Sequence, residues 1–423
     1  MSEKVKRFRY LIFLKDTILL AITAFGGPHA HISHMFKLLV EKRGYVSEEE
    51  LIELNALCQI LPGPTSTQTV IAIGYKTGGT KLALLTLLVW ILPAGASMIF
   101  LAVFITQFNA KTDADLTFTK YIQPMALSFI LYSGIRLARK VLHTKTAIFL
   151  FVSSIILSTT ITYWLGDKQI GAILFPVLLV FGGVFTALTK RFEQKKEWRK
   201  RRIQIDWTFF VWFVSIFVIA VLVGNLSGNK FLLQFENFYR NGSLIFGGGQ
   251  VLIPLLKTEF VELKDYLTSE EFLSGFGFVH GMPGPVFSFC GYLGAISEPF
   301  RMSVTEQVLA GAISLIGIFL PGTLLIFFVI KFWEELKKYR VVKASIEGIS
   351  AIASGMVMAA VITLLFEYDF RTGLFETSIE VGLTNYQGLI NVTIMIATFL
   401  LLIWDKVPAP FLILIGLLAG IWL

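Results

Sequence analysis

Long apolar segments, separated by short polar ones, run along most of this chain. Because a helix of roughly 20 apolar residues crosses a bilayer, we assign membrane spans to 9–26, 80–107, 118–140, 146–164, 169–188, 207–226, 231–249, 304–333, 342–366, 386–404 and 408–423. Two shorter apolar segments, 62–77 and 283–298, open with Pro-Gly-Pro. The pattern predicts an all-α polytopic membrane protein with about 13 transmembrane crossings.

Composition supports the membrane assignment and excludes several classes of protein. Of the 423 residues, 55% are hydrophobic and 16% are charged, against about 25% charged in a soluble domain. The mean hydropathy is +0.71. So much apolar surface excludes a soluble enzyme, a nucleic-acid binder and a secreted disulfide scaffold. We expect the lipid bilayer as the surroundings, no nucleic-acid partner despite the net charge of +8, and a first apolar segment that stays as an anchor.

Basic residues are unevenly distributed between the two predicted sides of the membrane. The break at 190–206 alone carries eight of them. When the N-terminus is placed inside, 26 Lys and Arg fall on the inner side and nine on the outer side. Cytoplasmic loops carry such an excess. The sequence therefore predicts a multi-pass protein of the cytoplasmic membrane with a cytoplasmic N-terminus.

A long internal repeat divides the chain. In the repeat alignment, which slides the sequence along itself by one constant shift, FGGP (25–28) falls on FGGG (246–249), GYVSEEEL (44–51) on DYLTSEEF (265–272), and LPGP (61–64) on MPGP (282–285). Such self-similarity indicates a duplicated architecture. It predicts an N-terminal repeat at 1–190, a basic cytoplasmic linker with a linking transmembrane helix at 191–227, and a C-terminal repeat at 228–423.

The two repeats are predicted to lie in opposite orientations. Segment 118–140 ends in RLARK and so runs toward the cytoplasm, whereas its partner 342–366 follows KKYRVVK and runs away from it. The odd linking span is what such an inversion requires. Inverted repeats are typical of secondary transporters, whose substrates bind near short, Pro/Gly-interrupted helices at the repeat interface.

The two Pro-Gly-Pro segments are the first candidates for that binding site. Proline at a helix start removes an N–H that would be unpaired, and the next N–H groups carry the positive end of the helix dipole. Hydroxyl and amide side chains there can also donate to an oxyanion. Alternatively, the segments merely kink helices, and the hydroxyls cap them. The candidates are Pro62, Gly63, Pro64, Thr65, Ser66, Thr67 and Gln68 in the first copy and Pro283, Gly284, Pro285 and Ser288 in the second.

Two glycine clusters and one intramembrane charge extend the candidate substrate site. The glycines serve either close helix packing or backbone that lines a cavity. A cation within a span either attracts the substrate or forms a structural pair with a carboxylate four residues away. These candidates are Gly26 and Gly27, Gly247, Gly248 and Gly249, and Arg240 with its neighbour Glu236.

Three residues are candidates for proton coupling, namely His31, His280 and Glu236. Histidine changes charge near neutral pH, which suits it to carrying protons. His29, His31 and His34 lie within six residues, but no carboxylate or thiolate completes a ligand set. We therefore expect no metal. The sequence contains no nucleotide loop or redox motif, so we expect no cofactor.

Several of these motifs together resemble the chromate ion transporter family. FGGP-x-AH (25–31), Tyr-Val-Ser-x-x-x-Leu (45–51), CQ-x-LPGP-x-x-x-Q (58–68) and GYKTGG (74–79) are similar to its first half, and FGGG-x-x-x-x-PLL (246–256) and PGP-x-F-x-F (283–289) to its second. The resemblance covers nearly the whole chain. It implies a long-chain, two-domain exporter of chromate, driven by the proton-motive force and giving chromate resistance. It also adds Gln59 to the substrate-site candidates. Gln250 and Ala21 depart from the family pattern.

Other functions remain open on the sequence alone. Sulfate has nearly the shape and charge of chromate, so composition does not separate the two oxyanions. An anion channel on the same scaffold is a second alternative, and a membrane enzyme is a third, although no catalytic set is evident. A homodimer is compatible with all of them. Whether 28–60 and 250–282 are re-entrant or interfacial is also open.

Overall fold

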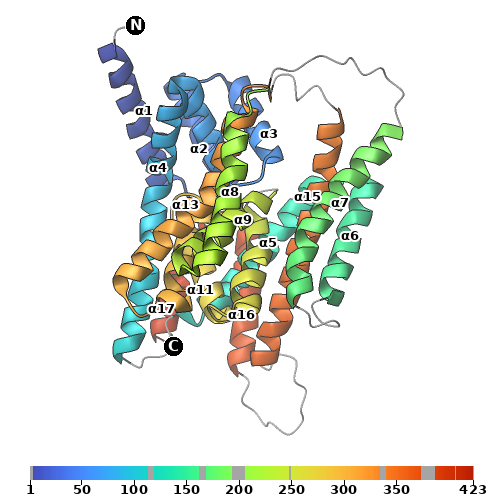
Figure 1. The fold of residues 1–423 in the computed structure, drawn as a ribbon. Helices are drawn as coiled ribbons and strands as arrows, with labels where there is room; N and C mark the ends of the chain where they lie inside the picture. Colours follow the sequence, from blue (N-terminus) through green and yellow to red (C-terminus); the bar gives the residue numbers. More distant parts are fainter. Residues whose placement is uncertain are drawn as a thin grey trace.

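The computed structural model describes residues 3–112, 119–161, 168–192, 205–246, 249–333, 340–372, 386–404 and 406–422. Every regular element among these residues is helical. Figure 1 shows the longer helices packed beside one another, with the start of α1 and the end of α17 toward opposite ends of the molecule. The predicted fold class, an all-helical polytopic membrane protein, is confirmed.

The helices follow the predicted spans closely. The first half contains α1 (Glu3–Thr23), α2 (Gly27–Met35), the π-helix η1 (Phe36–Lys42), α3 (Glu48–Ile60), α4 (Thr65–Thr112), α5 (Ile122–Val141), α6 (Lys145–Thr160) and α7 (Lys168–Phe192). The rest contains α8 (Thr208–Ser227), α9 (Lys230–Leu244), η4 (Gly249–Val251), α10 (Leu252–Lys257), η5 (Thr258–Leu263), α11 (Ser269–His280), η6 (Val286–Ser288), α12 (Phe289–Ile296), η7 (Glu298–Phe300), α13 (Val304–Val329), α15 (Arg340–Thr372), α16 (Tyr386–Trp404) and α17 (Ala409–Trp422).

Only some of these helices meet a strict length criterion for crossing a membrane. Among the described residues, three stretches are long and apolar enough, namely Thr65–Gln107, Val304–Val329 and Ser345–Leu365. Six shorter apolar helices are also present among the described residues, and the outward faces of most of them and of α4 expose large apolar side chains such as Trp212 and Phe100. A water-soluble protein would bury such faces. The number of crossings stays a prediction.

The backbone breaks where glycine allows it. Within α4, Gly78 and Gly79 leave helical geometry, with Gly79 at φ 74°. The break separates a short helix over 65–77 from a long one over 80–112. This is the division that the apolar pattern predicts between 62–77 and 80–107.

The polar segments at 28–60 and 250–282 are themselves helical. Each contains a π-helical turn followed by a short helix with a capping box, Ser47 with Glu50 in α3 and Thr268 with Glu271 in α11. In such a box the hydroxyl accepts from the third helical N–H and the carboxylate accepts from the N-cap N–H. The two boxes occupy matched positions in the repeat alignment.

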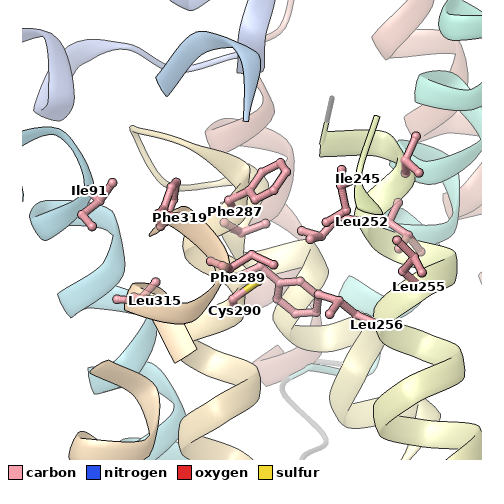
Figure 2. Close-up of a cluster of buried hydrophobic side chains, with 14 of the residues drawn as sticks. Ile91, Ile245, Leu252, Leu255, Leu256, Phe287, Phe289, Cys290, Leu315 and Phe319 are labelled. Carbon is pink, nitrogen blue, oxygen red and sulfur yellow. The ribbon is translucent and has the colours of Figure 1, made fainter. Parts of the chain in front are cut away.

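Aromatic and aliphatic side chains fill the centre of the molecule. Figure 2 shows Phe287 of η6 and Phe289 and Cys290 of α12 near Leu315 and Phe319 of α13. All five side chains are buried. This packing fixes the position of the second Pro-Gly-Pro segment, which immediately precedes these residues.

Helices from the two halves pack against each other. In the second half α15 packs against α6 and α7, and in the first half α5 packs against α16 and α17. The α15 contact is tight, because Gly348 lies against the backbone of Gly182 and a Cβ on Gly355 would clash with Ser154. Small residues of this kind let membrane helices approach closely.

Candidate substrate cavity

The two Pro-Gly-Pro segments are each held by the opposite half of the chain. The Gly63 N–H donates to the carbonyl of Ile245 (2.7 Å), and the Gly284 N–H donates to the carbonyl of Ala24 (3.0 Å). Gly63 and Gly284 have φ of 118° and 106°, a region that side chains rarely allow. Ala24 and Ile245 each stand two residues before a glycine cluster in the sequence, so each Pro-Gly-Pro segment contacts the residue that directly follows the first helix of the opposite half.

Each central glycine also fits against a residue that follows a proline within a long helix. A Cβ on Gly63 would lie 3.2 Å from the Cα of Gly322, and one on Gly284 would lie 3.0 Å from the Cβ of Ala94. Gly322 follows Pro321 in α13, and Ala94 follows Pro93 in α4. Close approach of the chain therefore explains the need for glycine in both Pro-Gly-Pro segments.

Side chains at the start of α4 form hydrogen bonds within the protein. Ser66 Oγ lies 3.0 Å from Nδ1 of His31, and Trp90 Nε1 donates to Thr67 Oγ1 (3.1 Å). The amide of Gln68 donates to the carbonyls of Pro62 (2.8 Å) and Gly322 (3.1 Å). Ser66, Thr67 and Gln68 are buried, whereas Thr65 is half-buried. These bonds connect the residues that follow the first Pro-Gly-Pro segment to α2, to the later part of α4 and to α13.

The second copy is far less polar. Its helix starts with Val286, Phe287 and Ser288, and the buried Ser288 Oγ has no hydrogen-bond partner among the described residues. Buried hydroxyls are normally satisfied. Ser288 is therefore one of the few exceptions among the buried hydroxyls of the described residues.

A cavity of about 300 Å³ opens beside the second Pro-Gly-Pro segment. It brings together five of the residues that the sequence predicts for the site, namely Gly26, Gly27, Gly249, His280 and Gly284. Its full lining is Gly26, Gly27, Phe129, Tyr132, Ser133, Arg136, Gly249, Phe276, Val279, His280, Met282, Gly284, Val286, Leu402, Lys406, Val407, Pro408 and Ala409. Pro283 and Pro285 flank Gly284 in the chain.

Other predicted site residues do not line this cavity. Gln59 and the run from Pro62 to Gln68 lie outside its lining, as do Ser288, Arg240, Glu236 and His31. Gly247 and Gly248 lie outside the described residues. A substrate role for all of these residues stays a prediction.

The charge of the cavity is positive. Arg136 of α5 and Lys406, in the turn between α16 and α17, are its charged lining residues, and no carboxylate belongs to the described lining. Gly26 and Gly27 have φ of 92° and 76° and begin α2, whose N-cap has no side-chain hydrogen bond. Unpaired N–H groups at a helix start favour anions. The cavity therefore suits an anion rather than a cation.

Arg136 and Lys406 are not among the residues that the sequence singles out for the site. Arg136 lies near the end of the predicted span 118–140, and Lys406 lies between the last two predicted spans; both contribute to the inner-side count of basic residues. Nothing in the sequence indicates that the two positions meet, because they belong to opposite halves of the chain. Only the packing of α5 against α16 and α17 brings them to one cavity.

The two candidate histidines have different surroundings. His280 lines the cavity, its Nδ1 lies 2.9 Å from the carbonyl of Phe276, and its ring stacks on Phe129 with centroids 4.5 Å apart. A carbonyl only accepts, so Nδ1 carries a proton, and in the neutral ring the lone pair is then at Nε2. His31 is fully buried against Trp90, and its Nε2 has no partner among the described residues.

Arg240 belongs to a partly buried ionic network outside the cavity lining. Its guanidinium binds Glu236 (2.8 Å) and both carboxylate oxygens of Glu259 (3.0 and 3.1 Å). Lys264 binds Glu259 (3.2 Å) and donates to Asn237 (2.6 Å). Two cations thus face two carboxylates. The sequence predicts the pair with Glu236 as one alternative, but it missed Glu259, which lies on another element.

The helical fold, the apolar outer faces and the positive central cavity define a polytopic membrane protein of the transporter class. A family model described as "Chromate transporter" matches residues 12–225 and 232–421. The chain belongs to the chromate transporter family.

Similar proteins include several chromate transport proteins. The chain is 24% identical to a "Probable chromate transport protein" of Synechococcus elongatus, over 95% of this chain and 92% of that one. It is 24% identical to the "Chromate transport protein" of Pseudomonas aeruginosa, over 83% and 79% of the two chains. It is 23% identical to that of Cupriavidus metallidurans, over 82% and 80%. No solved structure matches significantly.

Proposed function

We propose that this protein is a secondary active transporter that exports chromate across the cytoplasmic membrane. The proton-motive force drives the export, and the export confers chromate resistance. The main support for this proposal is the positive cavity. Both halves line it with glycine backbone, and no carboxylate is among its described lining residues. A tetrahedral dianion matches such a lining, because N–H groups and cations stabilise charge spread over several oxygens.

The proposal includes inverted repeats and alternating access. In support, Gly63 and Gly284 are matched by the repeat alignment, and so are their acceptors Ile245 and Ala24. The two hydrogen bonds are therefore equivalent under exchange of the halves. In Figure 1 the start of α1, the end of α7 and the end of α13 lie toward one end of the molecule, as the predicted threading requires.

The predicted site residues outside the cavity fit the same scheme. In the repeat alignment, the lining residues His280, Gly284 and Val286 match Gln59, Gly63 and Thr65. Likewise Gly26 and Gly27 match Gly247 and Gly248. We propose that this matched set lines an equivalent cavity that opens to the other side, at the site where α15 now packs against α6 and α7.

Movement of the halves would then transfer the anion between the two sides. In this proposal the hydrogen bonds from each Pro-Gly-Pro segment to the opposite half stay formed during transport. The tight contact of α15 with α6 and α7 closes the second cavity in the present conformation. His280 has a lone pair at Nε2 and lines the cavity, and it is the proton-coupling residue of the proposal. The Arg240 network is a structural element, because its four charges neutralise one another.

Radiolabelled chromate flux in everted membrane vesicles tests the proposal. Uptake into vesicles should be uphill when a pH gradient is imposed and should collapse when an uncoupler removes it. Flux that only dissipates a chromate gradient would indicate a channel instead. Sulfate is added as a competitor, and stronger inhibition by sulfate than by chromate itself would assign the protein to sulfate.

A further inference from the structure

Two cations at the cavity come from opposite halves of the chain. Arg136 lies on α5 and Lys406 in the turn before α17, and both side chains are exposed. Neither has an ion pair with any residue in the described part of the chain. Lys406 Nζ lies 5.1 Å from the ring centroid of Trp404. An unpaired cation at a cavity wall is free to bind an anion from solution.

For each of these two cations, the matched position in the opposite half of the chain carries no charge. The repeat alignment places Arg136 on Val357 of α15, which is fully buried and lies close to Gly134 of α5. Near the ends of the two halves a different shift applies, which matches Pro176 with Pro410 and Gly182 with Gly416; this second alignment places Lys406 on Ala172. The cationic pair therefore belongs to one of the two equivalent cavities, and the threading of the chain puts it on the cytoplasmic side.

We propose that Arg136 and Lys406 together form a docking site for the oxyanion dianion, which captures it from the cytoplasm and selects it over monoanions. The proposal rests on the proposed function. A dianion gains from two fixed cations about twice the attraction that a monoanion gains. The guanidinium can bind two oxygens of one oxyanion, whereas the ammonium acts as a point charge.

The charge asymmetry between the two halves concerns affinity. A cavity lined by both cations binds the dianion more tightly than a cavity without them, so the site captures the anion at low cytoplasmic concentration. The driving gradient, and not this asymmetry, sets the direction of net transport. Because the attraction is electrostatic and the side chains are exposed, it weakens with salt.

Equilibrium binding of chromate to the purified full-length protein in lipid nanodiscs is the test, with nitrate as the monoanion probe. Arg136→Gln and Lys406→Gln are compared with Arg139→Gln, an exposed arginine on α5 that does not line the cavity. Arg136→Lys and Lys406→Arg keep the charge. Each glutamine variant should weaken chromate binding on the order of tenfold, lose part of its salt dependence and change nitrate binding less. The control should bind like the wild type.

The outcomes separate this inference from the proposed function. If the wild type binds chromate and both glutamine variants bind it equally well, with the same salt dependence, the docking site is overturned while chromate transport stands. If Arg139→Gln weakens binding as much as Arg136→Gln does, general surface charge explains the effect, and the docking site is again overturned. If the wild type binds no tetrahedral dianion at all, the proposed function fails as well.

Discussion

The amide of Gly63 donates to the carbonyl of Ile245, in the opposite half of the chain, over 2.7 Å. The bond anchors the first Pro-Gly-Pro segment to the residue that precedes the FGGG motif. An equivalent bond from Gly284 to Ala24 anchors the second segment. Neither half can therefore complete its central loop without the other, which joins the two halves at the centre of the proposed transport path.

Replacing either central glycine should damage both folding and transport. Gly63→Ala and Gly284→Ala each place a side chain at a strongly positive φ and against a neighbouring backbone or methyl group. We expect a loss of about 1–3 kcal/mol in stability for each variant, with little transport. Thermal unfolding in detergent and chromate flux measure the two effects. Gly44→Ala is the control, because Gly44 has φ of 60° but open space around it. A control as damaged as the others would refute the close-approach argument.

Hydroxyls at the start of α4 should have separable roles. Thr67→Val removes the acceptor for Trp90 Nε1, and a buried unpaired N–H costs about 1–3 kcal/mol, so stability should fall. Thr65 is half-buried and matches Val286, a lining residue of the cavity, in the repeat alignment. Because Thr65→Val removes a proposed donor to the substrate, it should lower chromate flux on the order of tenfold with near-normal stability. Ser66→Ala completes the series. Wild-type flux in all three variants would mean that these hydroxyls are only caps.

Arg240→Ala should be more harmful than Glu236→Ala. Loss of the guanidinium leaves the buried carboxylates of Glu236 and Glu259 short of a partner, and breaking a buried pair in this way costs about 3–5 kcal/mol. Loss of Glu236 leaves Arg240 bound to Glu259 by two hydrogen bonds. Expression level and thermal stability measure the difference. Equal defects that disappear in the double variant would instead support an isolated pair.

His280→Gln should uncouple transport from protons. Glutamine occupies the matched position in the first half, Gln59, and it carries no charge at any pH near neutrality. The variant should still bind chromate, but imposing a pH gradient on vesicles should no longer accelerate uptake. His31→Gln, at a fully buried histidine outside the cavity, is the comparison. Undiminished stimulation of the His280 variant by the gradient would remove that residue from the coupling mechanism.

Cysteine labelling should settle the predicted topology. Cys58 and Cys290 are both buried, so membrane-impermeant thiol reagents report introduced cysteines with little background. Gln194→Cys, in the basic linker, should react from the cytoplasmic side. Ser227→Cys, at the exposed end of α8, should react from the opposite side. Labelling of Gln194→Cys only from outside would reverse the threading.

The sequence by itself determined the helical membrane class and most helix boundaries. These are local properties, because apolar length, glycine breaks and Pro-Gly-Pro starts act within a few residues of one another. The repeat was visible as well, since the matched motifs from FGGP to LPGP keep one constant shift. Of the candidate site residues, Gly26, Gly27, Gly249, Gly284 and His280 line one cavity; their role in substrate binding stays a prediction.

Only the tertiary structure decided which candidates meet. Arg136 and Lys406 reach one cavity because α5 packs against α16 and α17, and Glu259 reaches Arg240 from a π-helical turn. The amides of Gly63 and Gly284, offered by the sequence as anion donors, are used by carbonyls of the opposite half. Such partners depend on contacts between distant segments, and a linear pattern of polar and apolar residues does not specify those contacts.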